Sequence, residues 1–264
     1  MDLELGGKRA LVTGSTGGIG FAAARLLAAE GAAVVVNGRT RPRVDDAVRR
    51  IRAAVPEAEV RGVAADLGSL AGCDALADAA GEVDVLVNNV GIFQPLPFEE
   101  IPDADWLRFY ETNVLSGVRL SRRVLPGMRE RNWGRIVFVS SESAVQIPSE
   151  MIHYGVTKTA QLAVARGLAE TTAGTGITVN SVLPGPTASE GVGTFVREMA
   201  HARGVTFEAM EAEFFQTARP SSLLRRFATP DEVAAMIVYV CSGRASATNG
   251  AALRVDGGVV RSIL

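Results

Sequence analysis

A tyrosine and a lysine four positions apart are the residues best suited to acid–base chemistry in this chain. Tyr154 and Lys158 lie in a stretch, residues 152–171, that is expected to be a helix, so their side chains would share one face, one turn apart. An ammonium beside a phenol lowers the phenol pKa from about 10. A tyrosine tuned in this way exchanges a proton with an alcohol or carbonyl oxygen, and Ser141, upstream, could hold that same oxygen. The pattern also fits an ordinary amphipathic helix, so the rest of the chain must decide.

Length and composition indicate one globular unit. The chain has 264 residues, of which 47% are apolar, and a net charge of −2 with acidic and basic residues interspersed. We therefore expect a single domain, residues 1–264, without nucleic acid or an anionic membrane as partner. Cys73 and Cys241 form no C-x-x-C pattern, so we expect no metal site and no disulfide framework. With no signal-peptide pattern and no membrane-length apolar run, the expected location is cytoplasmic.

Short β-rich runs alternate with Ala-rich helical stretches along the chain. The expected strands are 9–13, 33–37, 60–64, 83–88, 135–140, 177–182 and 251–255. The expected helices are 19–30, 43–54, 70–80, one or two within 103–131 with a kink at Pro126, 152–171 and 230–241. This alternation predicts an α/β fold in which helices cover both faces of a doubly wound parallel sheet. Ligands of such sheets bind beyond the carboxyl ends of the strands.

A glycine-rich loop follows the first expected strand. Thr13 to Gly20 reads T-G-S-T-G-G-I-G and leads directly into a helix. Gly14, Gly18 and Gly20 allow a tight turn and a close approach of backbone N–H groups to a pyrophosphate at the positive end of that helix. A Gly-rich turn that binds nothing is the alternative. The position of the glycine-rich loop, in the first βα turn of the chain, favours dinucleotide binding over this alternative.

Taken together, the motifs and their order resemble the short-chain dehydrogenase/reductase superfamily. They are the glycine loop, Asn88-Asn89-Val90-Gly91, Asn113, Ser141, Tyr154, Lys158 and Pro184-Gly185. Within the superfamily the chain resembles the 3-oxoacyl-carrier-protein reductase-like members. The resemblance implies a Rossmann-type sheet of seven parallel strands, a nicotinamide cofactor and chemistry between an alcohol and a carbonyl.

The resemblance also implies roles for individual residues. Tyr154 would be the acid/base, Lys158 would bind the nicotinamide ribose, Ser141 would orient the carbonyl, and Asn113 would hold a water in a proton relay. The implied cofactor-binding residues are Gly14, Ser15, Thr16, Gly18, Ile19, Gly20, Asp66, Leu67, Asn88, Gly91, Tyr154, Lys158, Pro184, Gly185 and Thr187. The chain departs from the family at Val90, where alanine is usual, and at Glu142, which is expected to point to solvent.

The end of the second expected strand indicates which nicotinamide cofactor is used. NAD-preferring relatives carry an acid there that bonds the ribose 2′-hydroxyl, but this chain has Gly38 followed by Arg39. A guanidinium pairs well with a 2′-phosphate, which favours NADP(H), with NAD(H) as the alternative. The competing interpretation is that Arg39, Arg41 and Arg43 form a solvated basic loop.

The segment 187–227 is longer than a simple crossover and is expected to be a helical lid over the substrate. Its large apolar residues are Phe195, Met199, Phe207, Met210, Phe214 and Phe215. The other wall would be lined by Phe93, Gln94, Leu96, Val145 and Gln146. These residues predict an apolar or medium-sized carbonyl substrate. His153 abuts Tyr154 but points elsewhere on the helix, so we expect it to be a packing or surface residue.

The leading hypothesis is an NADP(H)-dependent oxidoreductase that works in the reductive direction. The alternatives are an NAD-linked alcohol or sugar dehydrogenase, and a non-catalytic dinucleotide sensor on the same fold. A sensor would not need Ser141, Tyr154 and Lys158 together. The resemblance further implies a homotetramer that pairs through the helix after the fourth strand, the Tyr154 helix, the last strand and the apolar tail, residues 259–264.

Overall fold

The computed structural model describes residues 1–189, 200, 201 and 203–263 of the chain. Its centre is a parallel sheet with the strand order β3-β2-β1-β4-β5-β6-β7. The strands are β1 Arg9–Val12, β2 Ala33–Gly38, β3 Val60–Ala64, β4 Val85–Asn88, β5 Gly134–Val139, β6 Ile177–Pro184 and β7 Ala252–Val255. The strand order reverses direction between β1 and β4, which creates a crevice at the carboxyl ends of these strands. The predicted seven-stranded, doubly wound sheet is confirmed.

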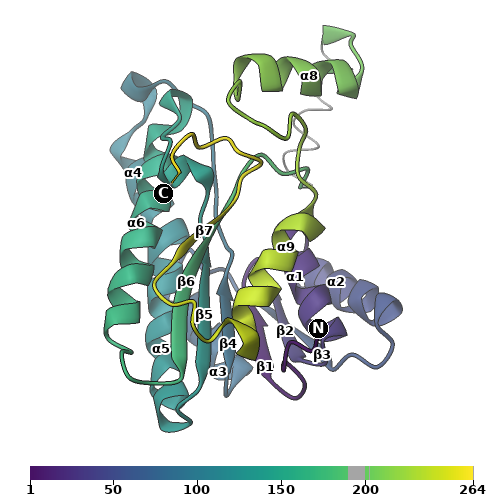
Figure 1. Ribbon diagram of the computed structural model, residues 1–264, viewed down its shortest axis with the longest axis vertical. Coiled ribbons are helices and arrows are strands. Elements are labelled where there is room, and N and C mark those ends of the chain that lie inside the picture. Colours follow the sequence, from purple (N-terminus) through teal and green to yellow (C-terminus); the bar gives the residue numbers. More distant parts are fainter. Residues whose placement is uncertain (190–199, 202, 264) are drawn as a thin grey trace.

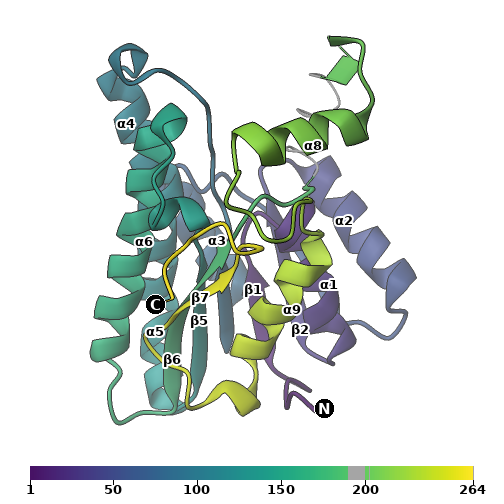
Figure 2. The same ribbon diagram turned by 45° about the horizontal axis from the view of Figure 1, so that its top comes forward.

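Helices cover both faces of the sheet (Figure 1). The described helices are α1 Gly18–Ala29, α2 Arg41–Ala54, α3 Leu70–Ala80, α4 Asp103–Tyr110, α5 Ser116–Glu130, α6 Ile152–Glu170, α8 Phe207–Thr217 and α9 Pro230–Cys241. One face is covered by α1, α2 and α9, and the other by α3, α5 and α6. Figure 2 shows α8 standing apart from both layers, at one end of the sheet. None of the described helices combines the length and hydropathy that a membrane crossing needs.

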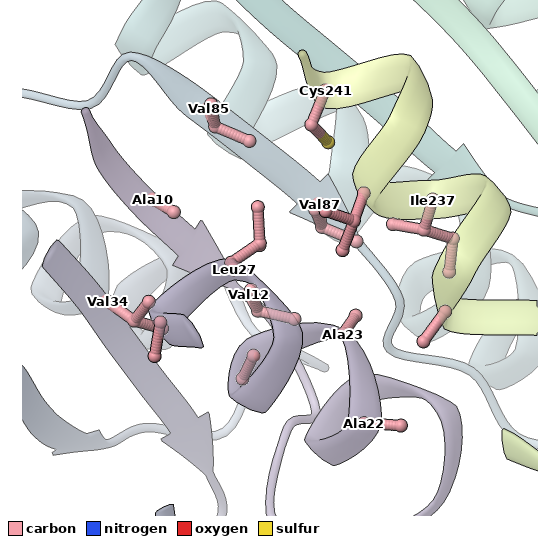
Figure 3. Packing of buried hydrophobic residues seen from close by; sticks show 14 of the residues in the cluster. Ala10, Val12, Ala22, Ala23, Leu27, Val34, Val85, Val87, Ile237 and Cys241 are labelled. Atoms are coloured by element: carbon pink, nitrogen blue, oxygen red, sulfur yellow. The ribbon is translucent and has the colours of Figure 1, made fainter. Parts of the chain in front are cut away.

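The core forms because the strands are rich in valine and the helices beside them are rich in alanine. Val12, Val34 and Val87 are buried under α1, where Ala23 is small enough to bring helix and sheet close together (Figure 3). Ile237 of α9 completes this layer. Each fully buried valine or leucine contributes about 1.5–3 kcal/mol to stability, so the sheet is a firm base for the loops at its carboxyl edge.

Two features of the helices and strands affect the site. The one or two helices expected within 103–131 are two, α4 and α5, which a π-helical turn, Glu111–Leu115, separates, and Pro126 lies inside α5. A π turn leaves backbone groups free of their usual helical partners and is common at functional sites. Strand β6 extends two residues further than expected, to Pro184, because Leu183 and Pro184 still pair with β7. This extension carries the chain to the edge of the crevice.

Candidate active site

A pocket of about 700 Å³ opens at the carboxyl edge of the sheet and brings most of the predicted site residues together. It is lined by Gly14, Thr16, Gly18, Ile19, Gly20, Arg39, Gly91, Ser141, Tyr154, Lys158, Pro184, Gly185 and Thr187. Five predicted residues are not among its lining residues: Ser15, Asp66, Leu67, Asn88 and Asn113. Ser15, Leu67, Asn88 and Asn113 are buried, and the Asp66 carboxylate accepts a hydrogen bond from the Gly68 N–H in the turn before α3.

The glycine loop has the backbone that an anion site requires. Gly14 and Gly18 adopt positive φ angles of 58° and 55°, which favour glycine. A side chain on Gly20 would place its Cβ 2.4 Å from Asn89 Nδ2 and 2.5 Å from the Gly14 carbonyl oxygen. Helix α1 begins without a side-chain cap at Gly17, so its first N–H groups remain available to a ligand. The loop therefore fits the pyrophosphate of a dinucleotide.

Two asparagines that the sequence analysis did not assign to the site hold this loop in place. Asn89 Nδ2 donates to the carbonyl oxygens of Thr13 and Gly14, both at 3.0 Å. Asn37, buried near the end of β2, accepts from the Gly14 N–H at 3.3 Å through its side-chain oxygen, and its own backbone N–H donates to Ser15 Oγ at 2.9 Å. Ser15 thus supports the loop from behind. The available signal was an amide side chain near the end of β2 and another directly after β4, the two strands that flank β1.

The predicted acid–base residues lie on the first two turns of α6. Tyr154 is half-buried and Lys158 is buried, and the Lys158 Nζ is 5.6 Å from the centroid of the Tyr154 ring. Lys158 Nζ donates to the Val139 carbonyl oxygen at 2.9 Å and to Gln161 Oε1 at 3.3 Å. Since the N–H⋯O bond to Val139 anchors the ammonium at the end of β5, the lysine is oriented by the sheet.

Burial changes the acidity of both groups. It raises the pKa of the Tyr154 phenol, while the hydrogen bond with Ser141 lowers it. The expectation that Lys158 lowers this pKa is wrong for the structure described here, because loss of solvent outweighs the other effects and the ammonium is directed at Val139 and Gln161. Burial also lowers the pKa of Lys158 to about 8. At neutral pH the pair therefore holds a neutral phenol beside a protonated lysine, the state in which the phenol can give up a proton.

Glu142, expected in solvent, is instead 5% exposed and contacts the predicted catalytic serine. Its Oε2 accepts from Ser141 Oγ at 2.5 Å and from the Ser143 N–H at 2.8 Å. Its Oε1 accepts from Nε of Arg219 at 3.0 Å. The prediction failed because a buried carboxylate is stable only when it is paired, and its partner, Arg219, lies far along the chain. Sequence reasoning missed Arg219 altogether.

Asn113 lies in the π turn and is buried behind the pocket. Its side chain donates to the Ile92 carbonyl oxygen and to Thr157 Oγ1, both at 3.0 Å, and accepts from the Ile92 N–H at 2.8 Å. Its main-chain carbonyl oxygen accepts from Gln161 Nε2. Gln161, which the sequence analysis did not single out, thus connects Lys158 to Asn113.

The other end of the pocket lies at β2. Arg39 is exposed there and Gly38 is buried, with Thr16 so close that a Cβ on Gly38 would lie 2.4 Å from its Cγ2. A side chain at position 38 would therefore require the Thr16 side chain of the glycine loop to move. Thr187 is buried after β6, and its hydroxyl donates to the Gly185 carbonyl oxygen at 2.9 Å.

The expected lid is described only in part. Helix α8 packs Met210 and Phe215 against Phe227, and Phe214 and Phe227 also line the pocket. Phe195 and Met199 lie outside the described residues. On the opposite wall Phe93 lines the pocket, whereas Gln94, Leu96, Val145 and Gln146 are not among its lining residues. His153 is buried against the rings of Trp106 and Phe109, which confirms a packing role.

The chain resembles known oxidoreductases over its whole length. A family model described as short chain dehydrogenase matches residues 8–200. The chain is 48% identical to the uncharacterized oxidoreductase YvaG of Bacillus subtilis, with 100% of both covered, and 34% identical to a D-beta-hydroxybutyrate dehydrogenase of Cupriavidus necator, with 97% of this chain and 99% of that one covered. L-sorbose reductase from Gluconobacter frateurii has a similar structure, with a TM-score of 0.94 at 32% identity and 100% of both chains covered. The chain therefore belongs to the short chain dehydrogenase family and is an NAD(P)-dependent oxidoreductase that acts on a CH–OH or C=O group.

Proposed function

We propose that the protein is an NADP(H)-dependent reductase of a medium-sized carbonyl compound. Hydride would pass from nicotinamide C4 to the carbonyl carbon while the Tyr154 phenol gives its proton to the oxygen, and the reverse transfers would oxidise the alcohol. The cofactor supplies the hydride, and the chain supplies binding and the proton. The observation that carries this proposal is the single pocket that joins the glycine loop to Ser141, Tyr154 and Lys158.

The residues at the chemical end of the pocket have complementary roles in this proposal. Tyr154 is the acid, and its neutral phenol suits reduction. Lys158, fixed by Val139, would bond the nicotinamide ribose and Ser141 the substrate oxygen. Asn113 acts through Gln161 and the π turn. Asn88 and Gly91 support the nicotinamide side, and Thr187 the carboxamide.

The preference for NADP(H) is supported by residues at the end of β2. Arg39 lines the pocket, and the residue before it is Gly38 and not an acid. A 2′-phosphate would therefore meet a guanidinium and no repulsive charge. The solved L-sorbose reductase structure contains NADPH and L-sorbose. An NAD-linked dehydrogenase is the second candidate, because one of the proteins similar to this chain is a D-beta-hydroxybutyrate dehydrogenase.

Further features belong to the same proposal. Residues 1–264 would form one domain, with 187–227 as the lid. The protein would be a cytoplasmic homotetramer, supported by the exposed Leu107 and Tyr110 on α4 and Val156 on α6. The tail offers less apolar surface for contacts between subunits than the sequence suggested, because Val259 and Val260 are already buried against their own chain. Ile263 is exposed, and Leu264 lies outside the described residues.

The direct test is a screen of ketones and 3-oxoacyl thioesters with NADPH and NADH, followed by absorbance of the reduced nicotinamide. We expect at least one carbonyl substrate and a kcat/KM for NADPH at least about tenfold above that for NADH. A preference for NADH would reject the cofactor assignment in favour of the NAD-linked alternative. Cofactor binding without turnover of any carbonyl would favour a dinucleotide sensor.

A further inference from the structure

The substrate end of the pocket contains a buried ion pair, Glu142–Arg219. The two side chains are 6% and 11% exposed, and Arg219 Nε lies 3.0 Å from Glu142 Oε1. Glu142 directly follows the predicted carbonyl-binding Ser141, while Arg219 follows α8. Both residues line the pocket together with Tyr154. A substrate held by Ser141 and Tyr154 would therefore lie against this pair.

The charge at this wall is not balanced. Arg219 Nη1 also contacts Glu150 Oε1 at 3.3 Å, so one guanidinium faces two carboxylates. Lys158, another cation lining the described pocket, directs its ammonium at Val139 and Gln161. Arg39 and Arg43 lie at the β2 end, three strands away from β5. Glu142, Glu150 and Arg219 together thus carry a net charge of −1, whereas the Lys158 ammonium is held at the end of β5.

The pair nevertheless has hydrogen-bonding capacity to spare. Glu142 Oε2 accepts from Ser141 Oγ and from the N–H and Oγ of Ser143, whereas Oε1 accepts from Arg219 alone in the described part of the chain. A carboxylate oxygen takes about two such bonds. Arg219 uses Nε and Nη1 for its described bonds, and its Nη2 makes none with the described residues. Because both residues line the pocket, they can offer one acceptor and one donor site to a ligand there, which is what a hydroxyl group needs.

We propose that Glu142 and Arg219 are specificity-determining residues that select a neutral, hydroxylated carbonyl substrate and reject substrates with a carboxylate close to the reacting carbon. The inference rests on the proposed function and adds to it the substrate class. The hydroxyl would donate to Glu142 Oε1 and accept from Arg219, and the remaining carbons would lie along Phe93 and Phe214. A substrate carboxylate would meet the excess negative charge in a partly desolvated site, where like charges repel strongly.

The test uses three ketones that share a propyl arm and differ only at the other end: 1-hydroxyhexan-3-one, hexan-3-one and 3-oxohexanoate. We expect the parent protein to reduce the hydroxyketone with a kcat/KM at least about tenfold above that for 3-oxohexanoate. Glu142→Gln keeps the shape, and its amide oxygen can still accept from Ser141 and Ser143, but it removes both the charge and the acceptor for Arg219 Nε. It should raise the ratio of kcat/KM for 3-oxohexanoate to kcat/KM for hexan-3-one at least about tenfold.

Arg219→Gln removes the positive member and should shift 3-oxohexanoate in the opposite direction, a crossed result that simple loss of packing does not give. The matched control is Glu213→Gln on α8, which breaks an exposed ion pair with Arg203 and should leave all three kcat/KM values unchanged. Circular dichroism and NADPH affinity verify folding. Two results would overturn the inference while leaving the proposed function intact. One is a parent protein that prefers 3-oxohexanoate to the hydroxyketone. The other is a ratio of kcat/KM for 3-oxohexanoate to kcat/KM for hexan-3-one that is the same in Glu142→Gln as in the parent. No reduction of any ketone despite NADPH binding would instead overturn the proposed function.

Discussion

Gln161 receives a 3.3 Å hydrogen bond from the ammonium of Lys158, its neighbour one turn earlier in α6. The other end of the Gln161 amide donates to the main-chain carbonyl oxygen of Asn113 in the π turn. All three residues are buried. A single amide therefore satisfies two groups that would be costly to leave unpaired.

Replacing Gln161 by leucine should destabilise the protein, because the Lys158 ammonium and the Asn113 carbonyl oxygen would each lose a hydrogen-bond partner. Lys158 would lose an acceptor and Asn113 a donor, so we expect the free energy of unfolding to fall by about 1–3 kcal/mol, and kcat to fall because the lysine is less well oriented. Urea unfolding and initial rates measure the two effects. Gln216→Leu, on the exposed face of α8, is the control. Equal stabilities of the two variants would show that the Gln161 bridge contributes nothing.

The buried Lys158 predicts a pH-dependent stability. Its pKa is about 8 in the folded protein and 10.5 when exposed, so below pH 8 both states are protonated and burial of the charge opposes folding in full. Between pH 8 and 10.5 the unfolded state binds more protons, so stability rises with pH. The gain should approach about 3 kcal/mol.

The measurement is the difference in unfolding free energy between the parent and Lys158→Met across this pH range. Subtracting the two curves removes the contribution of the other titrating groups. The parent should gain stability relative to the variant as the pH rises. A flat difference would mean that Lys158 is not buried in the folded protein.

Gly20→Ala should disable the phosphate loop. The new methyl would lie 2.4 Å from Asn89 Nδ2 and 2.5 Å from the Gly14 carbonyl oxygen, so loop or asparagine must move. We expect NADPH affinity, measured by fluorescence titration, to fall at least about tenfold, since a 1.4 kcal/mol loss is enough. Gly167→Ala is the control, because position 167 in α6 has no neighbour within 4 Å, and alanine there should stabilise the helix by up to about 1 kcal/mol. Unchanged affinity in Gly20→Ala would contradict the assigned loop.

Arg39→Ala tests the cofactor end of the pocket. Loss of a charge-assisted bond to the 2′-phosphate should lower kcat/KM for NADPH about tenfold or more and leave the value for NADH nearly unchanged. Arg41→Ala removes another exposed arginine, which pairs with Asp45, and should change neither kcat/KM value. If both arginine variants behave alike, the arginines form only a basic surface.

The fold could be predicted because its signals are local. Valine-rich runs marked the strands, and the first glycine loop marked the crevice, so element bounds were mostly within two residues of those observed. Tyr154 and Lys158 were found because both lie on one helix. The glycine loop was recognised because its spacing lies within one turn.

What could not be predicted depends on contacts between distant residues. Glu142 looks solvent-exposed beside Ser141 until Arg219, 77 positions later, is brought against it. Gln161 reads as an ordinary helix residue until the π turn presents the Asn113 carbonyl. The acidity of Tyr154 was misjudged for a related reason. The spacing to Lys158 is a local property, whereas the burial that dominates the pKa is a property of the whole fold.

The most direct test of the account is the turnover of Tyr154→Phe, which removes one hydroxyl and leaves the ring in place. With the best ketone from the screen and saturating NADPH, we expect kcat to fall by about 10²- to 10⁴-fold, the usual contribution of a general acid, while NADPH affinity stays within about threefold of the parent value. Turnover at the parent rate would show that the proton comes from another group and would contradict the central claim.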